Sequence, residues 1–180
     1  MINYLVCIFL LACFLSTPSL ASNKNLSGTL VVVNKKDDTV NFIDLKSREV
    51  KYTRATGEGP HELAMNTKGT LAVVTNYIGG NSLTIFDVQQ AKKLRTVDLS
   101  NHPRPHGVLF LKDQRRVAVS SEGSDSVVIV DVMSGQIKKV IDTKQKGSHM
   151  VALPESSERV YTTNMDSNTV SELDVRSGAL

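Results

Sequence analysis

Short runs of β-branched and apolar residues alternate with polar turns along most of this chain. The clearest runs cover residues 30–34, 71–76, 117–121 and 160–164. A second run rich in Val and Ile follows each of them after a polar turn, as in Val127–Val130. No stretch has the 3.6-residue apolar period of an amphipathic helix. The pattern therefore predicts an all-β protein built from short strands.

One unit is repeated about four times. A box made of Asn or Asp, a hydroxyl residue and Val or Leu begins at Asp38, Asn81, Asp125 and Asn168, at steps of 43, 44 and 43 residues. A second aspartate stands six residues after the start of each box, at Asp44, Asp87, Asp131 and Asp174. A repeat of roughly 40 to 45 residues with four strands is the blade of a β-propeller. We expect antiparallel blades of this kind.

Three of the β runs end in Asn, at Asn34, Asn76 and Asn164, where we expect hydrogen bonds to the turns. Together with the boxes, they resemble the YVTN-type, or YncE-like, β-propeller repeat. The segment Val119-Ser120-Ser121-Glu122 departs from this pattern, with Glu122 in the Asn place. The resemblance covers residues 28–180. It implies a fold and no single activity, because similar repeats occur in proteins of unknown role, in lactonase-like hydrolases and near haem-containing reductases.

The resemblance also implies the order of strands within a blade. The strand that begins at a histidine is innermost, and the strand after the Ser-Gly turn is outermost. In this phase the chain supplies three strands, two blades of four and three more, about 14 in all, with Phe42, Phe86 and Ile129 in the core between blades. A seven-bladed ring would need about 28 strands. We therefore expect a partial β-propeller, an incomplete ring of a longer seven-bladed parent.

The first 21 residues are typical of a secretory signal peptide. They carry no charge, residues 6–15 are apolar, and small residues precede a cleavage point after Ala21. The apolar run is shorter than the roughly 20 residues that span a bilayer, so no stable membrane span is expected. A lipoprotein anchor at Cys13 is the weaker alternative. We expect a signal at 1–21, a linker at 22–27, a propeller at 28–180, and a periplasmic or secreted protein.

The composition and the motifs of the sequence exclude several kinds of functional site. Both cysteines, Cys7 and Cys13, lie inside the leader, so the cleaved chain would have no disulfide, thiolate metal site or cysteine nucleophile. The 21 Lys and Arg against 18 Asp and Glu give a net charge of +3, and these charges are scattered singly. Nucleic acid is therefore not an expected partner. The sequence has no serine-hydrolase elbow, zinc-protease helix, phosphate-binding loop or haem-attachment motif.

Three of the four histidines occupy one position of the repeat: His61, His106 and His149. Equivalent positions on innermost strands surround a common axis, so the three imidazoles should approach the same end of the channel. Three nitrogens and a water would suit Zn or Cu, the cofactors this interpretation predicts. Without a metal, mutual repulsion should lower their pKa values. Alternatively, each histidine is a structural hydrogen-bonding residue copied by duplication. Both interpretations stay open.

Two charged residues stand beside these histidines in the sequence. Glu62 and Arg104 are candidate ligand-binding residues, because either could meet a charged ligand. His102 lies in a proline-rich loop and is expected on the surface. The repeated aspartates end strands before turns, so we expect them to bond the turns and not to catalyse a reaction.

These features favour a secreted or periplasmic binding or scaffold protein, with no catalytic residue assigned. Its channel mouth would contact a protein or a small-molecule ligand. The alternative is a metal-dependent enzyme, lactonase-like or reductase-associated, with the three histidines among its ligands.

Overall fold

The structure, a computed structural model, describes residues 26–180. The expected signal peptide and both cysteines lie outside these residues. Within them the chain forms 14 strands and one short 3-10 turn, η1 (Met165–Ser167), and no α-helix. The prediction of an all-β chain with about 14 strands is confirmed.

The strands form four antiparallel sheets, which we call blades 1 to 4. Blade 1 contains β1 (Thr29–Asn34), β2 (Thr39–Asp44) and β3 (Glu49–Ala55). Blade 2 contains β4 (Pro60–Met65), β5 (Leu71–Asn76), β6 (Ser82–Asp87) and β7 (Lys92–Asp98). Blade 3 contains β8 (Pro105–Phe110), β9 (Arg116–Ser121), β10 (Ser126–Asp131) and β11 (Ile137–Asp142). Blade 4 contains β12 (Ser148–Ala152), β13 (Arg159–Asn164) and β14 (Thr169–Asp174).

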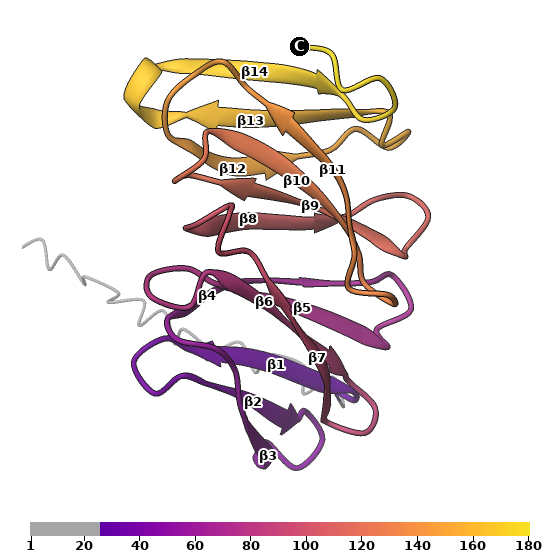
Figure 1. The fold of residues 1–180 in the computed structure, drawn as a ribbon. Helices are drawn as coiled ribbons and strands as arrows, with labels where there is room; N and C mark the ends of the chain where they lie inside the picture. The colour runs from indigo at the N-terminus through magenta and orange to yellow at the C-terminus, as the bar shows by residue number, and fades with distance from the viewer. Residues whose placement is uncertain (1–25) are drawn as a thin grey trace, which may run out of the picture.

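The blades follow one another as successive layers, from β1–β3 at one end of the molecule to β12–β14 at the other (Figure 1). Each sheet is a simple meander in which every strand pairs with the next along the chain. The expected division into three, four, four and three strands is confirmed. The chain is a partial β-propeller.

Apolar side chains fill the space between neighbouring blades, in one cluster for each of the three interfaces. Between blades 1 and 2, the rings of Phe42 and Phe86 meet edge to face with centroids 5.8 Å apart. Between blades 3 and 4, Ile129 is 1% exposed. All six residues of β10 are buried because this strand has a blade on each side, which explains its continuous run of Val and Ile. The predicted core residues are confirmed.

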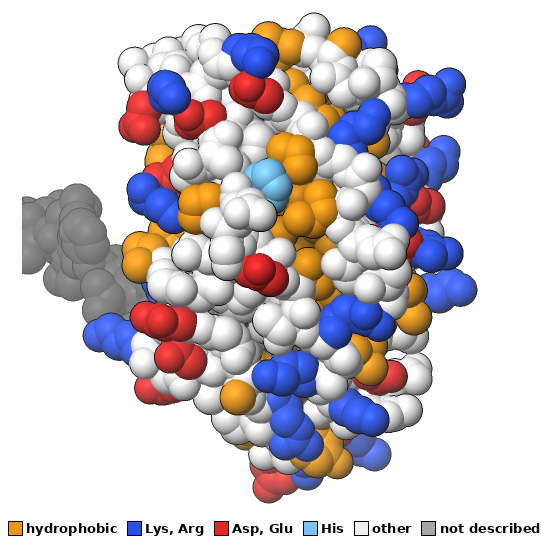
Figure 2. All heavy atoms as spheres, in the orientation of Figure 1, with side chains coloured by type: hydrophobic (Ala, Val, Ile, Leu, Met, Phe, Trp, Pro, Cys, Tyr) orange, Lys and Arg blue, Asp and Glu red, His pale blue; other side chains and the backbone are white. Residues whose placement is uncertain are grey.

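The outermost strands β3, β7 and β11 are mostly exposed. Lys and Arg side chains gather along one side of the face shown in Figure 2, with acidic side chains among and opposite them. None of the described residues forms a helix with the length and hydrophobicity needed to cross a bilayer.

In blades 1, 2 and 4 the asparagine at the strand end donates to the hydroxyl residue of the turn box that follows, as the sequence predicted. Asn76 is fully buried, and its side chain donates to the hydroxyls of Ser82 and Thr84, both at 2.9 Å. Its Oδ1 accepts from the Gly57 amide at 3.1 Å. Asn164 repeats the two hydroxyl contacts in blade 4. One side chain thus links two strands and, in blade 2, the preceding loop.

The strand register corrects the sequence alignment in blade 3. Ser121 pairs with Ser126 as Asn76 pairs with Ser82, so Ser121 and not Glu122 occupies the asparagine position. The sequence matched Glu122 to the asparagines because it is the more polar residue. In the structure, the serine hydroxyl takes the place of the asparagine amide. Glu122 lies one residue beyond the strand, where it has a different role.

The repeated aspartates close the turns after their strands, as predicted. Each carboxylate accepts a hydrogen bond from an amide three residues later, an arrangement that stabilises a tight turn. The pairs are Asp44 with Ser47, Asp87 with Gln90, Asp131 with Ser134 and Asp174 with Ser177, at 2.7, 2.8, 2.9 and 2.6 Å.

Replacing Asn76→Ala should lower the free energy of unfolding by about 2–4 kcal/mol, because three buried hydrogen bonds lose a partner. The matched control is Asn34→Ala, where one half-buried bond to Thr39 is lost. It should cost about 0.5–1 kcal/mol. Urea unfolding of both variants measures the difference. Equal losses would contradict the role assigned to Asn76.

Candidate functional site

A β-bulge near the start of each innermost strand sets the position of each histidine. Pro60 pairs with Asn76 and Leu63 with Val74, so two residues of β4, His61 and its neighbour, face one residue of β5. The same shift occurs in β8 and β12. Bulges bend a strand and change the direction of its side chains, often near functional sites. The residue before each histidine pairs with the neighbouring strand, so each histidine lies inside its strand.

A hydroxyl side chain closes each bulge and also joins the next blade. The Thr75 hydroxyl accepts from the Glu62 amide at 3.1 Å and donates to the carbonyl oxygen of His106 at 2.9 Å. In blade 3 the Ser120 hydroxyl repeats both contacts, toward the amide after His106 and the carbonyl oxygen of His149. The backbone at one histidine is therefore tied to the backbone at the next.

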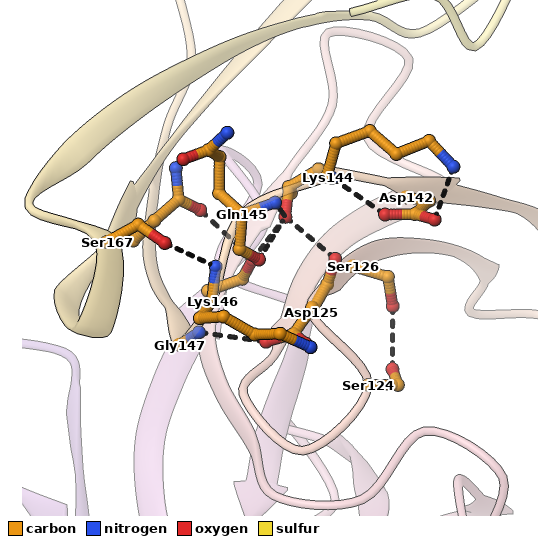
Figure 3. Close-up of polar contacts among 12 residues, drawn as sticks. Ser124, Asp125, Ser126, Asp142, Lys144, Gln145, Lys146, Gly147 and Ser167 are labelled. Atoms are coloured by element: carbon orange, nitrogen blue, oxygen red, sulfur yellow. Dashed lines mark hydrogen bonds and ion pairs between the residues drawn. The ribbon is translucent and has the colours of Figure 1, made fainter.

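A second set of contacts fixes the loops that lead into the histidines. In three of the four boxes of the repeat, the side chain of the first residue, Asn or Asp, accepts a hydrogen bond from the backbone amide two residues before a histidine. The pairs are Asp38 with Gly59, Asn81 with Arg104 and Asp125 with Gly147, at 2.8, 2.9 and 2.8 Å. Figure 3 shows the last of these, where Asp125 also receives Lys146 Nζ at 2.7 Å. All three acceptors have positive φ, a conformation in which Asn and Asp are enriched.

The structure brings three of the four imidazoles together. The ring centroids of His61 and His106 are 4.5 Å apart and those of His106 and His149 are 3.6 Å apart. His106, in the middle, is only 4% exposed, whereas the outer two are half-buried. His102 is separate and half-buried, with Nδ1 3.4 Å from the Ser124 hydroxyl.

A tyrosine packs against two of these imidazoles. The Tyr77 ring stacks on His61 at 5.3 Å and meets His106 edge to face at 5.0 Å. Its hydroxyl contacts the Glu122 carboxylate and accepts from Arg104 Nη2 at 2.8 Å. Arg104 also pairs with Glu122 at 2.5 Å. We call His61, His106, His149 and Tyr77 the histidine cluster.

Arg104 and Glu122 therefore hold Tyr77 in place. The Arg104 side chain is half exposed, whereas that of Glu122 is 8% exposed. Arg104, a candidate ligand-binding residue, reaches the histidine cluster through the tyrosine hydroxyl and already has two partners there.

Tyr77 and two residues that contact the cluster, Lys35 and Glu122, occupy one further position of the repeat, which Met165 fills in blade 4. Lys35, Tyr77, Glu122 and Met165 each follow the last residue of β1, β5, β9 or β13. The amides of the last three donate to equivalent loop carbonyls. Sequence analysis did not single out Lys35 or Tyr77, because the side chain differs in every blade. The only signal was their place, one residue after the strand end.

The pKa values of two imidazoles lie below their ordinary value. Burial lowers the pKa of His106 to about 4, and repulsion from His149, His61 and Lys35 adds to this. Burial, followed by the Lys35 ammonium, also lowers the pKa of His61. Lys35 Nζ lies 3.2 Å from His61 Nδ1. Mutual repulsion was the cause expected from the sequence, but burial contributes more. Both rings are uncharged at neutral pH.

Glu62 completes a group that could hold a metal ion. His61, Glu62 and His106 each offer one ligating atom, and these atoms all lie within 4.8 Å of one another. Within residues 26–180, the Glu62 carboxylate has no ion pair and His106 Nδ1 is buried with no hydrogen-bond partner. His149 lies beside this group, with its ring tilted against that of His106.

A cleft of about 550 Å³ lies at the other end of the strands, between blades 3 and 4, and includes Asp113, Arg116 and Asp174. Asp113 already pairs with Arg116 at 2.6 Å, and the Asp174 carboxylate bonds its own turn. The histidine cluster is the stronger candidate, because it contains a buried polar atom without a hydrogen-bond partner, His106 Nδ1.

Acid should destabilise the fold through His106. The unfolded chain, with a histidine pKa near 6.5, binds more protons than the folded chain between pH 6.5 and about 4. The free energy of unfolding should therefore fall by up to about 3 kcal/mol as the pH falls through this window. Urea unfolding in a chelating buffer measures this, and His106→Asn should lose most of the dependence. An unchanged slope in that variant would exclude His106 as the cause.

Comparison with known proteins supports the fold. No known family profile matches the chain, and no curated protein sequence matches it. Among solved structures, the chain is similar to one from "Kuenenia stuttgartiensis Hydrazine Synthase", with a TM-score of 0.76 and 20% identity. The similarity covers 84% of this chain and 44% of that chain, so this chain spans less than half of its length. At this identity the likeness shows the fold alone, a partial β-propeller.

Proposed function

We propose that this protein is an exported YVTN-type β-propeller binding protein whose histidine cluster contacts its ligand. The observation that carries this proposal is the convergence of three imidazoles and a tyrosine from three successive blades. A buried imidazole nitrogen without a partner is costly in a folded protein, so a ligand is a natural partner for it.

The surroundings of the cluster favour binding over catalysis. The hydroxyls of Thr75 and Ser120 lie nearby, but both already bond the backbone and serve to join blades. The Tyr77 hydroxyl is held between Arg104 and Glu122, and burial raises its pKa further from neutrality. These groups hold the site rigid and are not free to act as nucleophiles, which favours a scaffold over the enzyme alternative.

Specificity would come from the variable position of the repeat. The strands and bulges repeat nearly unchanged from blade to blade, whereas Lys35, Tyr77, Glu122 and Met165 differ in charge, size and polarity. Such a pattern is typical of repeat proteins that keep one scaffold and change a binding surface. A small polar ligand, or a polar segment of a partner protein, would meet a cation, a phenol, imidazoles and a thioether around this surface.

Mapping of small fragments by amide NMR shifts tests this function. The probes are a set of small carboxylates, phosphates and neutral amides, added to protein in chelating buffer. We expect the shifted amides to gather around residues 61, 106 and 149. Tyr77→Phe, which removes only the hydroxyl contacts, should change the set of fragments that bind. Shifts concentrated at the cleft between blades 3 and 4 would refute the proposal.

Export is the second part of this proposal, and it rests on the uncharged, apolar leader. Expression of the full chain in a bacterium, followed by intact mass measurement of the periplasmic fraction, should give a chain that begins at Ser22. Leu20→Arg, which places a large charge beside the cleavage site, should leave the leader attached. Lipid added at Cys13, or a full-length chain in the cytoplasm, would contradict this prediction.

A further inference from the structure

We propose that the histidine cluster binds a divalent first-row transition metal ion, with His61, Glu62 and His106 as its ligands and Lys35 as a cation that weakens its binding. This inference rests on the proposed binding function and names the ligand class. It also changes the ligand set expected from the sequence, because Glu62 takes the third position and His149 supports the site from beside it.

The placement of the ligating atoms carries the argument. One nitrogen of each histidine and one Glu62 oxygen lie within 4.8 Å of one another. Zinc bonds of about 2.0–2.2 Å would bring tetrahedral ligands to roughly 3–4 Å. Side-chain rotations that move the ligating atoms by about an ångström close this difference. His61 and Glu62 are half-buried and can make them, whereas His106 is fixed in the interior.

The bulge explains why these three groups meet. His61 and Glu62 are consecutive, and in a regular strand their side chains would point to opposite faces of the sheet. Here both stand opposite Thr75, because the bulge inserts one extra residue. Thr75 also holds the carbonyl oxygen of His106, so one hydroxyl sets the relative position of all three ligands.

The donor set selects the kind of ion. Two imidazoles and one carboxylate are a ligand set of open zinc sites, in which a water or an added ligand takes the fourth position. Imidazole nitrogen favours zinc, copper and nickel, whereas magnesium and calcium favour oxygen ligands. The Glu62 carboxylate, which forms no ion pair within the described residues, supplies negative charge.

Aromatic and polar neighbours hold the ligands in place. Tyr77 packs on both His61 and His106, and its hydroxyl is fixed by Arg104 and Glu122. The His149 ring also packs against His106, with ring centroids 3.6 Å apart. Such support orients metal ligands and is part of the strength of a site.

Lys35 opposes the ion. Its Nζ lies 3.2 Å from His61 Nδ1, and its positive charge acts on both ligand imidazoles. A dication that enters must displace this ammonium or tolerate its repulsion, which should reduce affinity by about five- to tenfold. Removing the charge should therefore strengthen binding. Loss of folding does not produce such a gain.

The test is titration of the chelator-treated full chain with zinc chloride by calorimetry, with cobalt(II) absorption to report the ligands. We expect one equivalent to bind. Glu62→Gln and His61→Gln should each weaken binding at least about tenfold, whereas Lys35→Met should strengthen it about fivefold. The controls Glu155→Gln and His102→Gln, which replace the same residue types away from the cluster, should leave affinity unchanged. Urea unfolding confirms that each variant folds.

Three outcomes would overturn the metal site. These are no saturable binding of zinc or cobalt(II), binding that survives both ligand variants, and weaker binding in Lys35→Met. The fragment mapping in chelating buffer keeps the two proposals apart. Fragments that gather at the cluster without a metal would preserve the binding function even if the metal site fails. Zinc binding at the cluster without any fragment binding there would support the metal site and refute only the binding of a small polar ligand in the absence of a metal.

Discussion

The fold depends on a hydroxyl group that does two tasks at two of the three junctions of blades, between blades 2 and 3 and between blades 3 and 4. Thr75 and Ser120 replace the backbone partner that a bulge removes, and they donate to the carbonyl oxygen of the next histidine. Both residues are fully buried, so an unmade bond would leave a polar group in the interior at a cost of about 1–3 kcal/mol. Apolar packing alone is non-directional, and these bonds give the blades a defined register.

The same contacts explain why the histidines and Glu62 come together at the innermost strands. A regular strand would have pointed consecutive side chains to opposite faces, whereas the bulge places a histidine and its neighbour against one hydroxyl residue. Successive blades repeat this geometry, so the imidazoles pack against one another, edge to face between His61 and His106 and tilted between His106 and His149. The packing buries His106 and keeps its ring uncharged. A structural role for the histidines and a binding role are thus compatible, since the backbone carbonyls of His106 and His149 join blades while their side chains face the cluster.

The repeat separates what must stay constant from what can vary. Bulge, hydroxyl, Asx acceptor and turn aspartate recur because each satisfies backbone groups that any blade must satisfy. The side chain that follows β1, β5, β9 or β13 satisfies no such backbone group, and it differs in all four blades. Lys35 places a positive charge beside the cluster, and the Tyr77 ring packs against two of its imidazoles. A propeller can acquire a new ligand by changes at this position without loss of its fold.

The sequence by itself determined the strand count, the grouping into blades, the core positions and the turn aspartates, because these follow from local alternation and from a repeat of constant length. It also indicated that three histidines approach one another. Only the tertiary structure decided that Glu62 joins them, that Arg104 is engaged with Tyr77 and Glu122, and that Ser121 fills the asparagine position. Those facts depend on bulges and on contacts between blades, which shift register by one residue and join positions about 30 to 45 residues apart. Residue spacing along a chain carries no direct record of either.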